Sequence, residues 1–173
     1  SLHFLSQYEY GVWLIIYGTL IWVDMFDMGL ANGLRNRLTE TIAIGDWRRA
    51  KRLVSTTVVV LSVIIVPIVL SFMIVISNID LYSLLNVDKI IVSNLYIITY
   101  ISLLFVCVTF VLKTICSIYL SLQLPAINNL ITALGQTLSS ISILLLICVG
   151  KGCLLNVAIV YTCSPLIAYA LAW

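Results

Sequence analysis

Charged residues are scarce in this sequence: Asp, Glu, Lys and Arg make up 9% of its 173 residues, whereas 62% are hydrophobic. A soluble domain is typically about half apolar and about a quarter charged. This composition excludes a soluble enzyme, a nucleic-acid-binding module and a disordered tail. It predicts an all-α membrane protein, a polytopic bundle of transmembrane helices. The few glycines and prolines, and the lack of alternating polar and apolar residues, argue against a membrane β-barrel.

Residues for metal and nucleophilic chemistry are also few. His3 is the single histidine, which excludes His-based metal sites and triads. The five cysteines lie in apolar sequence without CxxC spacing, and we interpret them as packing residues. Cys148 and Cys153 would pair only if the turn between them faces an oxidising compartment. We therefore expect no catalytic residue, no metal site and no cofactor.

Hydrophobic runs long enough to cross a bilayer occupy most of the chain. A helical crossing needs about 20 apolar residues, so the length allows about five or six spans. Gln123-Leu124-Pro125 divides the longest run, because the residue before proline avoids helix and proline favours the first helical turn. Pro67 predicts a kink within the second span. The predicted spans are 10–30, 53–79, 90–122, 126–149 and 153–173.

The two ends of the sequence suggest that it belongs to a longer chain. It starts at Ser1 rather than Met, and it stops at Trp173 inside an apolar run. No basic segment followed by a short apolar stretch and a cleavage site is present, so no signal peptide is expected. We interpret residues 1–173 as a single transmembrane region from a longer transporter-like protein.

Basic residues are concentrated in the connector 32–52, between the first two spans. The positive-inside rule places this connector in the cytoplasm. Within it, the pattern predicts a short helix over 38–44, closed by Gly45, and Asp46 as the N-cap of the next helix. Six of the nine basic residues lie here: Arg35, Arg37, Arg48, Arg49, Lys51 and Arg52.

This basic cluster has two interpretations. It determines the topology and nothing else, or it also binds anionic lipid or a pyrophosphate-linked substrate. Nucleic-acid binding is not expected, because the cluster is held between two membrane helices.

Polar residues inside the spans are the candidates for function. Asp24 and Asp27 share a helix face, and they form a cation, proton or gating site or else bond to groups near the interface. Lys113 lines a cavity and attracts phosphate, or it extends to the interface. Gln123, Asn128, Asn129 and Gln136 either join helices through hydrogen bonds or bind sugar hydroxyls.

Two motifs resemble a known transporter family. Tyr10-Gly11-Val12-Trp13 and Asp27-Met28-Gly29-Leu30-Ala31-Asn32-Gly33-Leu34-Arg35-Asn36 are similar to the YGxW start and DxGLxNGLRN end of the second helix in polysaccharide (O-antigen-type) flippases. These belong to the multidrug/oligosaccharidyl-lipid/polysaccharide exporter superfamily. Weaker similarity elsewhere extends over nearly the whole chain. Ala31 departs from the family, where glycine is common.

The resemblance implies a transporter of two helical lobes around a central cavity, in the bacterial cytoplasmic (inner) membrane. This chain would be helices two to six of the first lobe, without helix 1 and the C-terminal lobe. The implied function is the flipping of undecaprenyl-diphosphate-linked oligosaccharide, the O-antigen unit of lipopolysaccharide and other surface polysaccharides, by alternating access. No enzymatic activity is implied.

The same resemblance suggests roles for particular residues. Lys113 would contact the substrate headgroup, with Arg35 at the inner mouth and Gln123 and Asn128 as further substrate-binding residues. A buried diphosphate requires such cations and water along its path.

Four residues at the inner end of the first span are the gating and coupling candidates. Asp27 and Asn32 would act in gating, and Gly29 would allow close helix approach. Asp24 and Asp27 are the intramembrane acids that can sense a H⁺ or Na⁺ gradient.

Two alternatives remain at this stage. A cation-coupled multidrug antiporter shares the fold but needs acids deep in the helices. A non-transporting scaffold of a glycan-assembly complex would tolerate Lys113→Ala and Asp27→Ala.

Overall fold

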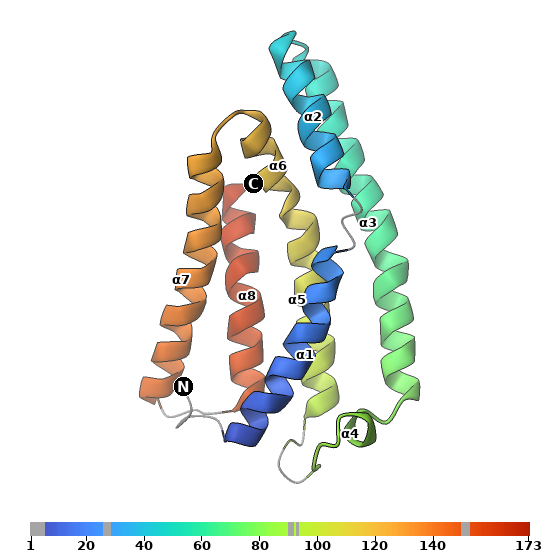
Figure 1. Cartoon of the computed structure of the whole chain (residues 1–173), viewed down its shortest axis with the longest axis vertical. Helices are drawn as coiled ribbons and strands as arrows, with labels where there is room; N and C mark the ends of the chain where they lie inside the picture. The colour runs from blue at the N-terminus through green and yellow to red at the C-terminus, as the bar shows by residue number, and fades with distance from the viewer. Residues whose placement is uncertain (1–5, 26–28, 90–91, 93, 150–152) are drawn as a thin grey trace.

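The computed structural model describes residues 6–25, 29–89, 92, 94–149 and 153–173, without the side chains of residues 23–25, 30 and 149. All regular elements in this part of the chain are α-helices (Figure 1). They are α1 (Gln7–Met25), α2 (Leu30–Ala43), α3 (Trp47–Asn78), α4 (Leu81–Leu84), α5 (Leu95–Leu112), α6 (Thr114–Ser121), α7 (Pro125–Val149) and α8 (Leu154–Ala172).

Four helical segments are long and apolar enough to cross a membrane: Trp47–Asn78, Leu95–Ser121, Pro125–Cys148 and Leu154–Ala172. One face of α3 illustrates this, because Val59, Val63, Val66, Leu70 and Ile74 recur at helical spacing and are each 54–65% exposed. A continuous apolar stripe of this kind is stable against lipid rather than water. The prediction of an all-α polytopic membrane protein is confirmed.

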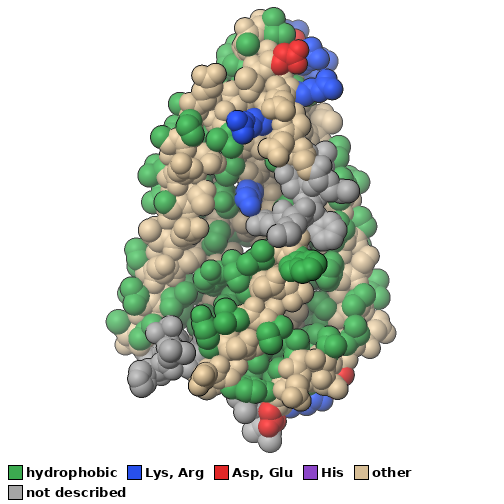
Figure 2. All heavy atoms as spheres, in the orientation of Figure 1, with side chains coloured by type: hydrophobic (Ala, Val, Ile, Leu, Met, Phe, Trp, Pro, Cys, Tyr) green, Lys and Arg blue, Asp and Glu red, His purple; other side chains and the backbone are tan. Residues whose placement is uncertain are grey.

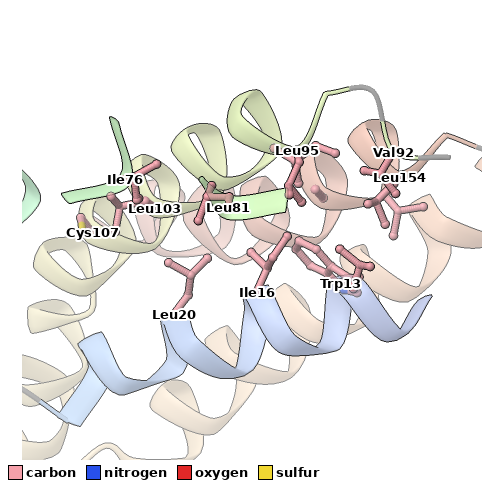
Figure 3. Packing of buried hydrophobic residues seen from close by; sticks show 14 of the residues in the cluster. Trp13, Ile16, Leu20, Ile76, Leu81, Val92, Leu95, Leu103, Cys107 and Leu154 are labelled. Atoms are coloured by element: carbon pink, nitrogen blue, oxygen red, sulfur yellow. The ribbon is translucent and has the colours of Figure 1, made fainter. Parts of the chain in front are cut away.

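The bundle is built around α5, which contacts α1, α3 and α8, while α7 packs along α8. We call the end that carries the α2–α3 hairpin (residues 30–52) the basic end, and the end that carries α4 the loop end. Hydrophobic packing fills the loop-end half: Trp13 and Ile16 of α1 lie against α5 and α8, where Leu95, Leu103 and Leu154 are at most 2% exposed (Figure 3).

The hairpin at the basic end is fixed by local stereochemistry. Gly45, at φ 76°, lets the chain reverse after α2, with its N–H donating to the Ile42 carbonyl and that of Asp46 donating to the Thr41 carbonyl. The Asp46 side chain accepts a hydrogen bond from the Arg49 amide at 3.0 Å, so the predicted N-cap is confirmed. The short helix expected over 38–44 is wrong in extent, because α2 begins at Leu30.

The basic residues of the hairpin lie on regular helix. With 32 residues, α3 is about 48 Å long, compared with a hydrocarbon core of about 30 Å. Its first turns, which carry Arg48, Arg49, Lys51 and Arg52, therefore extend past the hydrocarbon. Figure 2 shows charged side chains near both ends of the molecule.

The remaining helix limits agree with the predicted spans to differing degrees. α7 begins at the predicted proline, Pro125, and α3 continues as helix through Pro67. The third span differs most, because its helix starts at Leu95 and is interrupted at Lys113. In the first span, helix α1 ends at Met25.

Candidate substrate cavity

A cavity of about 740 Å³ lies between α1, α2, α5, α6, α7 and α8. The residues that line it come from the second half of α1, the first turn of α2, the end of α5, α6, the first half of α7 and the middle and end of α8, with Leu61 from α3. The cavity therefore extends from the basic-end half to about the middle of the bundle, where Tyr161 and Ser140 lie. On the face shown in Figure 2, a hollow with basic side chains along it lies on this side of the molecule.

Aromatic side chains close the deep end of the cavity. Tyr17 and Tyr161 both line it, with ring centroids 4.8 Å apart in an edge-to-face arrangement. Trp13, which is 4% exposed, stacks on Tyr17 at 5.6 Å and meets Tyr161 edge-on at 5.9 Å. This cluster lies between the cavity and the packed core, so the cavity does not continue toward the loop end.

Lys113 enters the cavity at a break in a membrane-spanning helix. The Cys116 amide donates to the Lys113 carbonyl at 2.9 Å, and this bond spans three residues rather than the four of an α-helix. The Leu112 carbonyl accepts a hydrogen bond from the Trp173 indole at 2.8 Å. Broken helices are tolerated at membrane depth where they line a polar cavity. Of the two interpretations of Lys113, the structure favours the cavity wall.

Several polar groups on the rest of the wall can accept hydrogen bonds. The hydroxyls of Thr109, Thr132 and Thr162 each donate to a carbonyl one turn earlier in their own helix, at 2.7–3.1 Å. Their oxygens keep acceptor lone pairs. The Asn128 Oδ1 atom is buried and has no hydrogen-bond partner among the described residues. A buried acceptor of this kind is stabilised when a donor reaches it.

The cavity brings together some of the predicted site residues. Lys113, Asn32, Asn128 and Gln136 line it; Asn32 comes from α2, Lys113 from the junction of α5 and α6, and the two amides Asn128 and Gln136 from α7. Arg35 is exposed and lies outside the lining, on the face of α2 that carries Asn32 and one turn closer to the basic end. The side chain of Asp24 and all of Asp27 lie outside the described residues, so the gating and coupling hypotheses for them stay predictions.

Gln123 lies outside the cavity, at the end of α6. Its φ is 57°, its N–H donates to the Leu120 carbonyl, and the Leu124 N–H donates to the Tyr119 carbonyl. This is the hydrogen-bond pattern that ends a helix with a left-handed residue, a position that glycine usually occupies. The geometry gives Gln123 a role in chain reversal before Pro125.

Gly29 was expected to allow close helix approach, but no such contact is found among the described residues. A Cβ added at Gly29 would meet no atom within 4 Å, but its φ of 78° lies in the left-handed region. The backbone turn before α2, rather than packing, is what requires glycine here.

The sequence analysis missed most of the cavity wall. Tyr17, Thr109, Ser139, Thr162 and Tyr161 line it, yet each lies within an apolar helix that contains similar residues facing elsewhere. Their periodicity gave no signal because hydroxyls bonded to their own helix are tolerated on any face.

The cysteines only partly follow the packing interpretation. All five are free thiols; Cys107 is buried, whereas Cys148 and Cys153 are exposed and unpaired with each other.

Replacement of Gln123 tests whether its role is conformational. We expect Gln123→Gly to keep the fold and to stabilise the protein by up to about 1 kcal/mol, because glycine removes the steric cost of positive φ. Gln123→Val should destabilise it, since a β-branched residue fits this region poorly. Thermal unfolding of the two variants and the unchanged protein measures both effects. A lower Tm for Gln123→Gly than for the unchanged protein would contradict the conformational role.

In comparisons with known proteins, no protein-family model, no curated protein and no solved structure matches the chain.

Proposed function

We propose that this chain is part of a polysaccharide flippase that moves undecaprenyl-diphosphate-linked oligosaccharide from the cytoplasmic to the outer leaflet. The proposal starts from the two sequence motifs around Trp13 and Gly29. The observation that carries it furthest is the cavity, which combines Lys113 with amide and hydroxyl groups inside a membrane bundle.

The chemistry of the cavity suits a glycan headgroup. Sugar hydroxyls are donors as well as acceptors, and the Asn128 Oδ1 and threonine oxygens are acceptors. Aromatic rings at the deep end, Tyr17 and Tyr161, offer apolar faces next to polar edges. Lys113 supplies a positive charge for a phosphate group as a flexible point charge.

The position of the cavity suits one half of an alternating-access cycle. It extends from the basic end, which the positive-inside rule assigns to the cytoplasm, to about the middle of the bundle, and hydrophobic residues pack the loop end. In this proposal the polyprenyl tail stays in lipid while the headgroup enters from the basic end. Passage outward requires the loop-end core around Leu95 and Leu103 to open against the second lobe.

A cation-coupled drug antiporter remains the competing function. It would need carboxylates in the cavity, whereas the positive charge of Lys113 on the described wall favours an anionic headgroup over a cationic drug.

Deletion of the full-length gene tests the proposal. We expect lipid-linked oligosaccharide to accumulate in the inner leaflet and surface polysaccharide to fall, with recovery when the gene is returned. Normal surface glycan together with greater sensitivity to cationic drugs would overturn the flippase and favour the antiporter. Normal glycan with no drug phenotype would overturn both the flippase and the antiporter.

A further inference from the structure

A second hollow of about 460 Å³ lies between α6 and the α2–α3 hairpin, on a different face of α6 from the cavity. We call it the hairpin groove. Its α3 wall includes Trp47, Lys51, Val54 and Val58, which recur at helical spacing on one stripe. Its volume falls in the range of about 300–1,000 Å³ that is typical of ligand sites.

The hairpin groove is charged at one end and apolar along its length. Lys51 lies in the second turn of α3, and the positions that follow it toward the membrane are Val54 and Val58. Ile118 and Leu122 of α6 form the facing wall. A polar group at the basic end and a hydrocarbon chain below it match this arrangement.

An indole at the start of α3 marks the depth of the groove in the membrane. Trp47 lines the groove, is 61% exposed and lies one turn before Lys51. Tryptophan concentrates at the level of lipid headgroups, so the charged end of the groove lies at the interface and Val58 lies within the hydrocarbon.

A second cation borders the groove. Arg48 lies seven and eleven residues before Ser55 and Val59, which line the groove, so all three share a face of α3. Arg49 points about 100° further around the helix, away from this face. The described residues that line the groove include no acid.

We propose that the hairpin groove binds an acidic glycerophospholipid of the cytoplasmic leaflet. Its phosphate lies between Lys51 and Arg48, and one acyl chain lies along Val54, Val58 and the α6 wall. Charge complementarity favours an anionic lipid over a zwitterionic one, since each basic residue near the surface strengthens binding to acidic lipid about five-fold. The site is separate from the cavity and does not rest on the proposed transport.

Lipid binding by the purified full-length protein tests this inference. Native mass spectrometry in detergent, with phosphatidylglycerol or phosphatidylcholine added, gives the affinity for each lipid. We expect preference for phosphatidylglycerol, about five-fold weaker binding for Lys51→Gln, and a further loss when Arg48→Gln is added. Arg49→Gln is the matched control, because it removes the same charge from the other side of α3 and should weaken binding less than Lys51→Gln does.

Two further measurements separate a lipid site from general attraction. Val58→Phe fills the apolar part and should weaken phosphatidylglycerol binding without any change in charge. Glycerol phosphate, which lacks acyl chains, should not displace the lipid. Equal losses for Lys51→Gln and Arg49→Gln, no effect of Val58→Phe in a folded protein, or displacement by glycerol phosphate would each overturn the proposal.

Discussion

Lys113→Gln is expected to reduce flipping by the full-length protein at least ten-fold. Lys113 is the basic side chain in the described wall of the cavity, within a segment that otherwise offers amides and hydroxyls. Hydrogen bonds to a charged group contribute about 1.5–3 kcal/mol, which corresponds to roughly 10- to 150-fold in affinity. The measurement is the ratio of lipid-linked oligosaccharide in the two leaflets, or the amount of surface polysaccharide, at matched expression.

Folding and function can be separated for this variant. A charge at membrane depth is costly, so its removal should leave stability unchanged or higher. Lys113→Arg keeps the charge and should retain most of the transport. Lys89→Gln removes a lysine at the loop end, where its Nζ lies 5.2 Å from the Tyr82 ring centroid, and should leave transport intact. Normal flipping by a stable Lys113→Gln protein would remove Lys113 from the proposed mechanism.

Gly135→Leu is expected to prevent α7 from packing against α8. A Cβ at Gly135 would lie 3.2 Å from the Pro165 Cα atom and 3.4 Å from the Ala168 Cβ atom. Because the closest of these atoms belongs to the backbone, it cannot move aside as a flexible side chain would. Membrane helices associate largely through such close contacts of small residues. We expect Gly135→Leu to yield little folded protein.

Gly135→Ala gives a quantitative form of this prediction. Overpacking of one methyl group costs about 1–3 kcal/mol, which lowers Tm by roughly 2–10 °C for a chain of this size. Gly18→Ala is the matched control in α1, because no atom lies within 4 Å of a Cβ there. Thermal unfolding of the full-length protein in detergent measures both. An equal Tm for the two alanine variants would show that the α7–α8 contact tolerates more space than the geometry indicates.

Local signals accounted for much of the fold. Hydropathy identified the apolar runs that the structure shows as helices α3, α7 and α8, because a helix that crosses a lipid bilayer needs a long run of apolar side chains. Asp46 and Pro125 marked helix starts, and Gly45 marked a helix end, since caps and positive φ depend on a few neighbouring residues.

Local sequence patterns failed where the position of a residue depends on segments that are distant in the sequence. The sequence placed Gln123 and Asn128 in one polar stripe, but Asn128 lies in the cavity wall and Gln123 reverses the chain outside it. It joined residues 90–122 into one helix, whereas the Trp173 indole, 61 residues away from Leu112, bonds to the carbonyl at the break. Such a bond between distant segments leaves no local pattern.

The sequence by itself therefore determined that this is a helical membrane protein, where most of its helices lie and which end carries the positive charge. Each of these follows from solvation or from backbone stereochemistry over a few residues. Only the tertiary structure decided which polar side chains share a cavity, because that depends on how each helix is rotated about its axis. The rotation is set by contacts between distant residues, such as Gly135 with Pro165 and Trp13 with Tyr161.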